Sequence, residues 1–264
     1  MKPGLLQQQV VWITGASGGL GEALAISASR RGARLVLSAR RGEELQRVRA
    51  LCADPAQVAV LPLDLLAFDA EAARAAAEAF FGPIDVLVNN AGISQRSAVV
   101  DTQMDVYRRI LELDFFAPVA LSKAVIPGMR ARGRGQLVTI SSVVGKVGTP
   151  QRSGYAAAKH ALHGFFDAAR AELARDGLRV TLVCPGYVRT QMSINAVTGD
   201  GRAHAKMDPG QVSGMDALRA ADKIWRGVER GREELYLGRE QAIIYLKRWC
   251  PALVSMIIRR VNRP

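Results

Sequence analysis

Cysteine is scarce in this chain, which has three among 264 residues: Cys52, Cys184 and Cys250. The number is odd, the spacing is wide and no C-x-x-C pair occurs. This usage argues against a disulfide framework and against a zinc site. We therefore expect no bound metal, and the cysteines fit a reducing cytoplasm as small apolar side chains.

Aromatic residues are also few, at 6% of the chain, and no basic patch interleaved with them is visible. The net charge of +12 alone is compatible with nucleic acid, an anionic membrane or a phosphate-rich ligand as the partner. Because basic and aromatic residues do not alternate in one patch, we expect no nucleic-acid partner.

Long apolar runs are absent too. No stretch reaches the roughly 18 uncharged apolar residues that a membrane-spanning helix needs. The N-terminal Met-Lys-Pro-Gly-Leu-Leu-Gln-Gln-Gln shows no apolar core of a secretory signal. We expect the chain to be cytoplasmic.

Short apolar runs, in contrast, alternate with helical patterns, and 49% hydrophobic residues can form a sizeable core. Unalternating apolar strands separated by amphipathic helices are typical of a parallel sheet covered on both faces. We predict an α/β fold, a single doubly wound Rossmann domain over 1–264 with a parallel sheet of about seven strands. The predicted strands are 10–13, 35–37, 58–61, 86–88, 137–140, 180–183 and 235–237, and the predicted helices are 22–31, 43–51, 69–81, 102–132 and 155–174.

Two stretches depart from this regular pattern. Pro118 falls inside the helical pattern at 102–132, where it is expected to cause a kink or a break. Residues 191–214 are rich in Gly, Ser, Asp and Asn. They are typical of a mobile loop near a site.

A glycine-rich turn, T-G-A-S-G-G-L-G from Thr14 to Gly21, follows the first predicted strand. Glycine is needed where backbone approaches a phosphate closely or takes a positive φ. The N-terminus of the following helix offers free N–H groups to a pyrophosphate. This strand–turn–helix context indicates a dinucleotide site. Its candidate cofactor-binding residues are Gly15, Ser17, Gly18, Gly19, Leu20 and Gly21.

The end of the second strand indicates which dinucleotide binds. An acidic residue at this place accepts a hydrogen bond from the ribose 2′-hydroxyl of NAD, whereas a basic one accommodates the 2′-phosphate of NADP. This chain has Ala39 there, followed by Arg40 and Arg41. We predict NADP(H), with Arg40 as the main contact and with Arg41 and Ser38 as lesser ones.

Tyr155 and Lys159 lie four residues apart on a predicted helix, which places both side chains on one face. A tyrosine hydroxyl is a poor base at neutral pH, and a neighbouring ammonium favours its phenolate form. Tyr155 can then donate or accept a substrate proton. Ser142, after the strand at 137–140, can donate a hydrogen bond to a carbonyl oxygen on which charge develops.

Together these motifs resemble the short-chain dehydrogenase/reductase family over nearly the whole chain. The resemblance implies that Tyr155 is the acid/base, that Lys159 also binds the nicotinamide ribose, and that Ser142, rather than the adjacent Ser141, orients the substrate. Tyr155 and Lys159 are therefore also counted among the cofactor contacts. The resemblance implies further contacts in the N-N-A-G segment, the D-L pair beside the adenine and the P-G-x-x-x-T segment at the nicotinamide. These are Asn90, Ala91, Gly92, Asp64, Leu65, Pro185, Gly186, Val188 and Thr190.

One position departs from the family pattern. The family usually has an asparagine in the long helix between the fourth and fifth strands, where it completes a proton relay. Here Leu113-Asp114-Phe115 places Asp114 at that position. We count Asp114 among the catalytic candidates, and expect a working relay with a shifted pH dependence.

Longer stretches such as V-L-P-L-D-L and N-N-A-G-I-S-Q-R-S are similar to one branch of the family. That branch contains dehydrogenase/reductase member seven and relatives of the hydroxysteroid and retinol dehydrogenases. The resemblance implies hydride transfer between a nicotinamide and the CH–OH or carbonyl group of a lipophilic steroid-, retinoid- or quinone-like substrate. It also implies a homodimer or homotetramer.

The C-terminal segment at about 239–260 combines apolar residues with Trp249 and flanking Lys and Arg. This pattern fits an amphipathic helix at a membrane surface. It equally fits a helix packed on a partner subunit or over the substrate pocket. Two alternatives to an enzyme stay open: Asp114 leaves room for an NADP(H)-binding redox sensor, and this segment leaves room for a membrane-surface protein without significant turnover.

Overall fold

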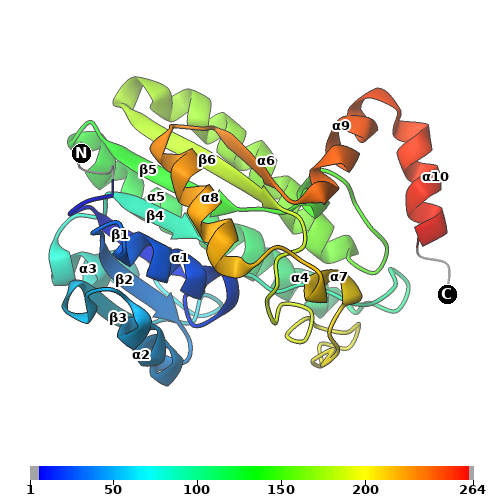
Figure 1. The fold of residues 1–264 in the computed structure, drawn as a ribbon, viewed down its shortest axis with the longest axis horizontal. Helices are drawn as coiled ribbons and strands as arrows, with labels where there is room; N and C mark the ends of the chain where they lie inside the picture. The colour runs from blue at the N-terminus through cyan, green and yellow to red at the C-terminus, as the bar shows by residue number, and fades with distance from the viewer. Residues whose placement is uncertain (1–5, 262–264) are drawn as a thin grey trace.

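The computed structural model describes residues 6–261, so positions 1–5 and 262–264 of the predicted domain lie outside the described residues. Its centre is one seven-stranded sheet with the strand order β3-β2-β1-β4-β5-β6-β7 (Figure 1). Every neighbouring pair of strands is parallel. The strands are β1 (Val10–Thr14), β2 (Arg34–Ala39), β3 (Val58–Pro62), β4 (Val86–Asn89), β5 (Gly135–Ile140), β6 (Leu178–Pro185) and β7 (Glu234–Leu237). This sheet confirms the predicted fold class.

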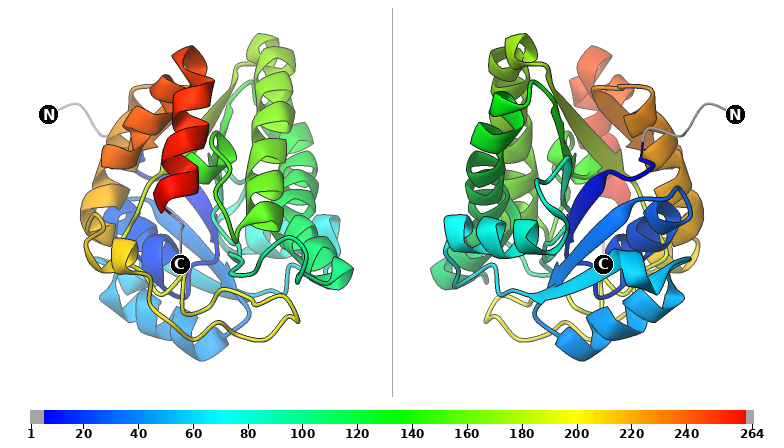
Figure 2. Two further views of the ribbon diagram at one scale, coloured as in Figure 1. Left: turned by 90° about the vertical axis from the view of Figure 1, so that its right-hand side faces the viewer. Right: turned by 90° about the vertical axis from the view of Figure 1, so that its left-hand side faces the viewer.

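Helices cover both faces of the sheet, as the two side views show (Figure 2). The buried residues of α1 (Gly19–Ser29), α2 (Gly42–Leu51) and α8 (Ala217–Glu229) share one hydrophobic core with the sheet. Those of α3 (Ala70–Phe81), α5 (Ala117–Ala131) and α6 (Ser153–Leu173) share the other. Short 3-10 turns lie at Pro55–Gln57, Val143–Gly145, Ala174–Asp176 and Arg239–Gln241.

The sequence analysis did not predict α8. Its buried residues recur at helical spacing, among them Ala221, Ile224, Trp225 and Val228. The indole Nε1 of Trp225 donates to the carbonyl oxygen of Leu24 at 3.0 Å, which joins α8 to α1. A short helix, α7 (Pro209–Val212), also interrupts the stretch at 191–214 that was predicted to be a loop.

The helical pattern at 102–132 corresponds to one continuous helical run over 104–131 that contains a π-helical turn. The run consists of α4 (Met104–Leu111), the π-helical turn (Glu112–Phe116) and α5. Pro118 lies directly after the π-helical turn, and the helical backbone continues across it without a break. The π-helical turn contains Asp114, whose side chain is buried. Such turns are frequent at functional sites.

At the C-terminus, α9 (Ala242–Trp249) and α10 (Pro251–Val261) are separate helices that meet at Cys250 and Pro251. They project from the end of the sheet in the red part of the ribbon (Figure 1). None of the helices in the described part of the chain combines the length and apolar character needed to cross a bilayer.

Candidate active site

The order of the strands locates the crevice in which a ligand is expected. The chain runs from β1 outward to β3 and then returns past β1 to β4. Ligands of such sheets bind at the carboxyl ends of the strands, where the direction of winding reverses. The turns after β1 and β4 meet at this switch point.

The glycine-rich turn after β1 leaves no room for a side chain at Gly15 or Gly21. Gly15 has a φ of +64°, and a Cβ there would lie 2.8 Å from the Cα of Ala91. A Cβ on Gly21 would lie 2.2 Å from the carbonyl oxygen of Gly15 and 2.6 Å from Nδ2 of Asn90. The backbone of the turn therefore stays bare in front of the N-terminus of α1. A phosphate can approach a cradle of this kind closely.

Asn90 holds this turn against β4. Its Nδ2 donates to the carbonyl oxygens of Thr14 at 2.9 Å and Gly15 at 3.2 Å. Thr14 Oγ1 accepts the backbone N–H groups of Asn90 and Ala91 at 3.1 and 3.2 Å. Sequence reasoning missed this role of Thr14. The signal was a polar residue at the last position of an apolar strand.

Gly21→Ala is expected to abolish nicotinamide binding, because the added methyl group collides with the backbone of Gly15 and forces the turn apart. Titration of nicotinamide fluorescence measures the loss. Gly18→Ala is the matched control for folding, since no atom lies within 4 Å of a Cβ at Gly18. Its melting temperature should equal that of the original chain. Unchanged NADPH affinity in Gly21→Ala would contradict the account of the turn.

The remaining cofactor candidates surround the same edge. Arg40 and Arg41 are exposed directly after β2. Ser38 is buried, and its Oγ accepts from Trp12 Nε1 at 2.9 Å. The carboxylate of Asp64 accepts the N–H of Leu66 at 3.0 Å, and Leu65 is buried.

The P-G-x-x-x-T segment reaches the glycine turn from the other side. A Cβ on Gly19 would lie 3.2 Å from Cβ of Thr190. Pro185 ends β6, and Gly186 packs so closely that a Cβ would lie 2.1 Å from Oε2 of Glu240. Val188 is buried and forms an isolated bridge with Met215. The structure thus brings Thr190 to the glycine turn, although the two are far apart in sequence.

Three catalytic candidates meet in a buried cluster. Tyr155 and Lys159, 6% and 4% exposed, lie on one face of α6, with the ammonium 5.5 Å from the phenol ring centroid. Lys159 Nζ donates to the carbonyl oxygen of Ile140 at 3.1 Å and lies 3.2 Å from Oδ2 of Asp114. The Asp114–Lys159 ion pair is the contact that a family asparagine would not provide.

The ion pair fixes the charge of the lysine. Burial raises the pKa of Asp114, against the opposing effects of Lys159 and of the Ile93 N–H, which donates to Oδ1 at 2.8 Å. Burial lowers the pKa of Lys159, but Asp114 and Tyr155 together more than offset this effect, so that the pKa is raised. Lys159 therefore stays an ammonium throughout the neutral range.

Ser142 lies at the end of β5, two residues after Ile140. Its Oγ accepts the N–H of Val144 at 3.2 Å, which caps the 3-10 turn Val143–Gly145. The neighbouring Ser141 points elsewhere and is buried, with its Oγ 3.0 Å from Nε2 of His163. The partly exposed Ser142 is therefore the serine that a substrate can reach.

Comparison with known proteins identifies the family to which the chain belongs. The family described as short chain dehydrogenase matches residues 9–200. A Drosophila melanogaster protein named dehydrogenase/reductase SDR family protein 7-like is 42% identical over 97% of this chain and 81% of its own length. This confirms the resemblance to the branch with member seven.

Two solved structures superimpose on nearly the whole chain. A short chain dehydrogenase from Burkholderia cenocepacia, in complex with NADP, is 25% identical with a TM-score of 0.78, covering 98% of this chain and 99% of its own. One from Burkholderia phymatum, in complex with NAD, is 22% identical with a TM-score of 0.80, covering 94% and 95%, and shows the shared fold. The chain belongs to the short-chain dehydrogenase family.

Proposed function

We propose that this chain is an NADP(H)-dependent oxidoreductase that interconverts an alcohol and a carbonyl group on a lipophilic substrate. The observation that carries the proposal is the buried cluster of Tyr155, Lys159 and Asp114 at the carboxyl edge of the sheet, beside the bare glycine turn. The turn and the N-terminus of α1 fit a pyrophosphate. The nicotinamide, when bound, supplies or accepts the hydride.

The protein's own residues handle the proton. In carbonyl reduction, the Tyr155 hydroxyl donates its proton to the substrate oxygen, and Ser142 donates a hydrogen bond to the same oxygen. The Lys159 ammonium stabilises the phenolate left behind. Asp114 and the Ile140 carbonyl hold that ammonium in place, and the Asp114 carboxylate partly offsets its electrostatic effect on the phenolate. In alcohol oxidation each step runs in reverse.

The choice of NADP(H) rests on Arg40 and Arg41 and on the absence of an acid at Ala39. Arg40→Ala is expected to raise the Kd for NADPH about 10- to 100-fold, since a hydrogen bond to a charged group contributes about 1.5–3 kcal/mol. The Kd for NADH should change little. Fluorescence titration measures both, and Arg30→Ala removes an equal, exposed charge as the control. If Arg40→Ala weakened the binding of NADPH and NADH equally, the assignment of Arg40 to the 2′-phosphate would be contradicted.

The proposed substrate pocket is formed by three loops that meet beside Tyr155. These loops contain Gln95 to Ser97, Gln151 and Val197, respectively. Gly154 N donates to Gln95 Oε1 at 2.7 Å, Arg96 N to the Val197 carbonyl at 2.8 Å, and Ser97 N to the Gln151 carbonyl at 3.2 Å. The pocket is tested by adding a panel of apolar ketones and aldehydes to the protein with NADPH. Oxidation of NADPH on a panel member supports the enzyme. Selective NADPH binding without turnover on any member would favour the redox sensor.

The terminal arm, defined as α9 and α10, supports a second proposal, peripheral contact with an anionic membrane surface. Trp249, at the end of α9, is 80% exposed, and Leu253 and Met256 are exposed on one face of α10. Both helices also carry basic residues, and residues 241–261 contain no acid; the basic residues are Lys247, Arg248, Arg259 and Arg260.

Arg259→Gln with Arg260→Gln is expected to weaken binding to phosphatidylserine vesicles about 30-fold, since each basic residue near such a surface contributes about 1 kcal/mol. Co-sedimentation measures the binding. Arg108→Gln with Arg109→Gln, on exposed positions of α4, is the matched control. If the original chain and both double variants sedimented equally with the vesicles, the membrane contact would be rejected. An arm that packs on a partner subunit or over the substrate pocket would then be favoured.

The proposed homodimer or homotetramer would use the outer faces of α5 and α6. Phe116, in the π-helical turn directly before α5, is 50% exposed, and its ring packs edge-on against Phe115 with centroids 5.1 Å apart. Phe115 in turn packs against Phe165 of α6. A monomeric mass by light scattering would contradict this assembly.

A further inference from the structure

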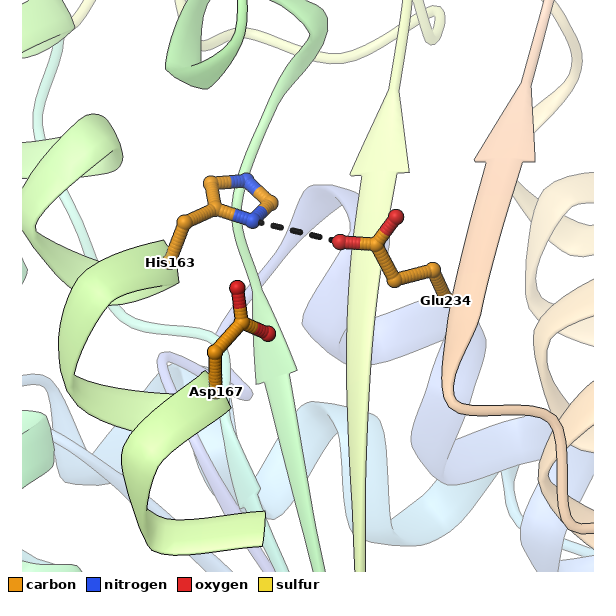
Figure 3. Close-up of side chains that lie close together, drawn as sticks. All are labelled: His163, Asp167 and Glu234. Carbon is orange, nitrogen blue, oxygen red and sulfur yellow. Dashed lines mark ion pairs between the residues drawn. The ribbon is translucent and has the colours of Figure 1, made fainter. Parts of the chain in front are cut away.

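A second polar cluster lies one helical turn beyond Lys159 on α6. His163 in this turn is 7% exposed. Its Nδ1 points at Glu234 of β7, 3.5 Å from Oε1 (Figure 3). Its Nε2 lies 3.0 Å from Oγ of Ser141. The imidazole therefore bridges the end of β5 to the edge strand of the sheet.

The Glu234 carboxylate accepts hydrogen bonds from two further side chains besides its contact with His163. Lys146 Nζ donates to its Oε1 at 2.8 Å, and the Tyr236 hydroxyl donates to Oε2. The contact with His163 and the hydrogen bonds from Lys146 and Tyr236 hold the pKa of Glu234 far below its usual range, despite burial. The carboxylate is therefore charged throughout the neutral range.

Lys146 directly follows the 3-10 turn that Ser142 caps, and this turn packs on α6 without spare room. A Cβ on Gly145 would lie 2.6 Å from Ser141 Oγ and 2.8 Å from the carbonyl oxygen of Lys159. Ser141 Oγ itself donates to that carbonyl at 3.3 Å. A small shift of the turn would therefore move Ser142 and Lys159 relative to each other.

The cluster also has the composition of a cation site, but its charges are already paired. His163, Asp167 and Glu234 place ligand atoms within 4.8 Å of one another. Lys146 occupies the Glu234 oxygen that faces the histidine, and Arg170 donates to Asp167 at 2.8 Å. A metal ion would have to displace both cations. The geometry therefore favours a structural connection between elements.

We propose that Ser141, Lys146, His163 and Glu234 form a clamp that sets the position of Ser142 relative to Lys159. In this clamp, Glu234 holds the Ser142 turn through Lys146 and holds α6 through His163. Ser141 joins the two inside the turn. His163 and Glu234 are positioning residues for the proposed hydride transfer, so the effect on rate rests on the proposed function.

The test compares Glu234→Gln, Lys146→Met and the double variant in NADPH-dependent reduction. Each single change is expected to lower kcat about tenfold, because sub-ångström misplacement of a catalytic group is costly, while the KM for NADPH stays within about twofold. The double variant should be no slower than Glu234→Gln alone, since Lys146→Met removes only a contact that Glu234→Gln already weakens. Lys146→Arg should rescue most of the rate. Glu233→Gln, an exposed neighbour of equal charge, is the control.

Amide hydrogen exchange provides a readout that does not depend on turnover. Exchange in residues 143–151 should speed up in Glu234→Gln and in Lys146→Met, and stay unchanged in Glu233→Gln. Unchanged exchange, or additive losses of kcat in the double variant, would overturn the clamp. If the original chain transfers no hydride to any substrate, the proposed function fails and the exchange result still decides the clamp.

Discussion

Replacing Tyr155 with phenylalanine is expected to lower the rate of hydride transfer about 10³-fold, within the range typical of a positioned proton donor. The Tyr155 side chain is buried, and phenylalanine fills the space of its ring, so the fold should be kept. Only the hydroxyl that exchanges a proton with the substrate oxygen is lost. NADPH affinity should stay within about twofold.

The measurement is stopped-flow oxidation of NADPH, together with fluorescence titration of the cofactor. Tyr245→Phe, on the exposed surface of α9, removes a hydroxyl far from the proposed chemistry and serves as the control. A Tyr155→Phe variant that keeps more than about a tenth of the rate would show that another group supplies the proton.

The second large effect is expected at Asp114. Asp114→Leu should destabilise the fold by about 3–5 kcal/mol, because it leaves the buried Lys159 ammonium without its carboxylate. It also removes the acceptor of the Ile93 N–H. Urea unfolding measures the change. Leu113→Ala, a partly buried neighbour, separates the loss of an ion pair from the loss of packing. If Asp114→Leu unfolded at the same urea concentration as the original chain, the ion pair would not stabilise the fold.

Asp114→Asn isolates the charge, since an amide oxygen can still accept from Ile93. The pKa of Lys159 is raised above 10.5, so its stabilising contribution is present below that pH and is lost as the pH rises through the raised pKa. Without the Asp114 carboxylate, burial dominates and the pKa of Lys159 falls. The alkaline limb of the rate profile should therefore move to lower pH.

For Asp114, in contrast, burial disfavours the charged form of the side chain. Its pKa is raised from 3.8, so its contribution to stability is full below that pH and declines as the pH rises through the raised pKa. In the asparagine variant, the free energy of unfolding measured in urea should no longer show this decline with rising pH. If the rate, its pH profile and the pH dependence of the unfolding free energy all match those of the original chain, Asp114 does not tune the relay.

The sheet followed directly from the sequence because buried parallel strands are continuous apolar runs, and each predicted strand lies inside an observed one. The π-helical turn could not be predicted from the sequence, because the apolar spacing at 102–132 continues across it. Asp114 was placed in the site by resemblance, but its ion pair with Lys159 depends on that turn. The clamp was not predicted because Ser141, His163 and Glu234 come from three elements that only the folded sheet brings together.

Transfer of deuterium is the most direct test of the central claim that this chain moves a hydride from NADPH to a carbonyl carbon. The protein would be incubated with NADPH deuterated at its reactive ring carbon and with the apolar ketones and aldehydes, and the products analysed by mass spectrometry. The account predicts deuterium on the carbinol carbon of at least one product, and none with Tyr155→Phe on the same time scale. Tight NADPH binding with no deuterium in any product would contradict it.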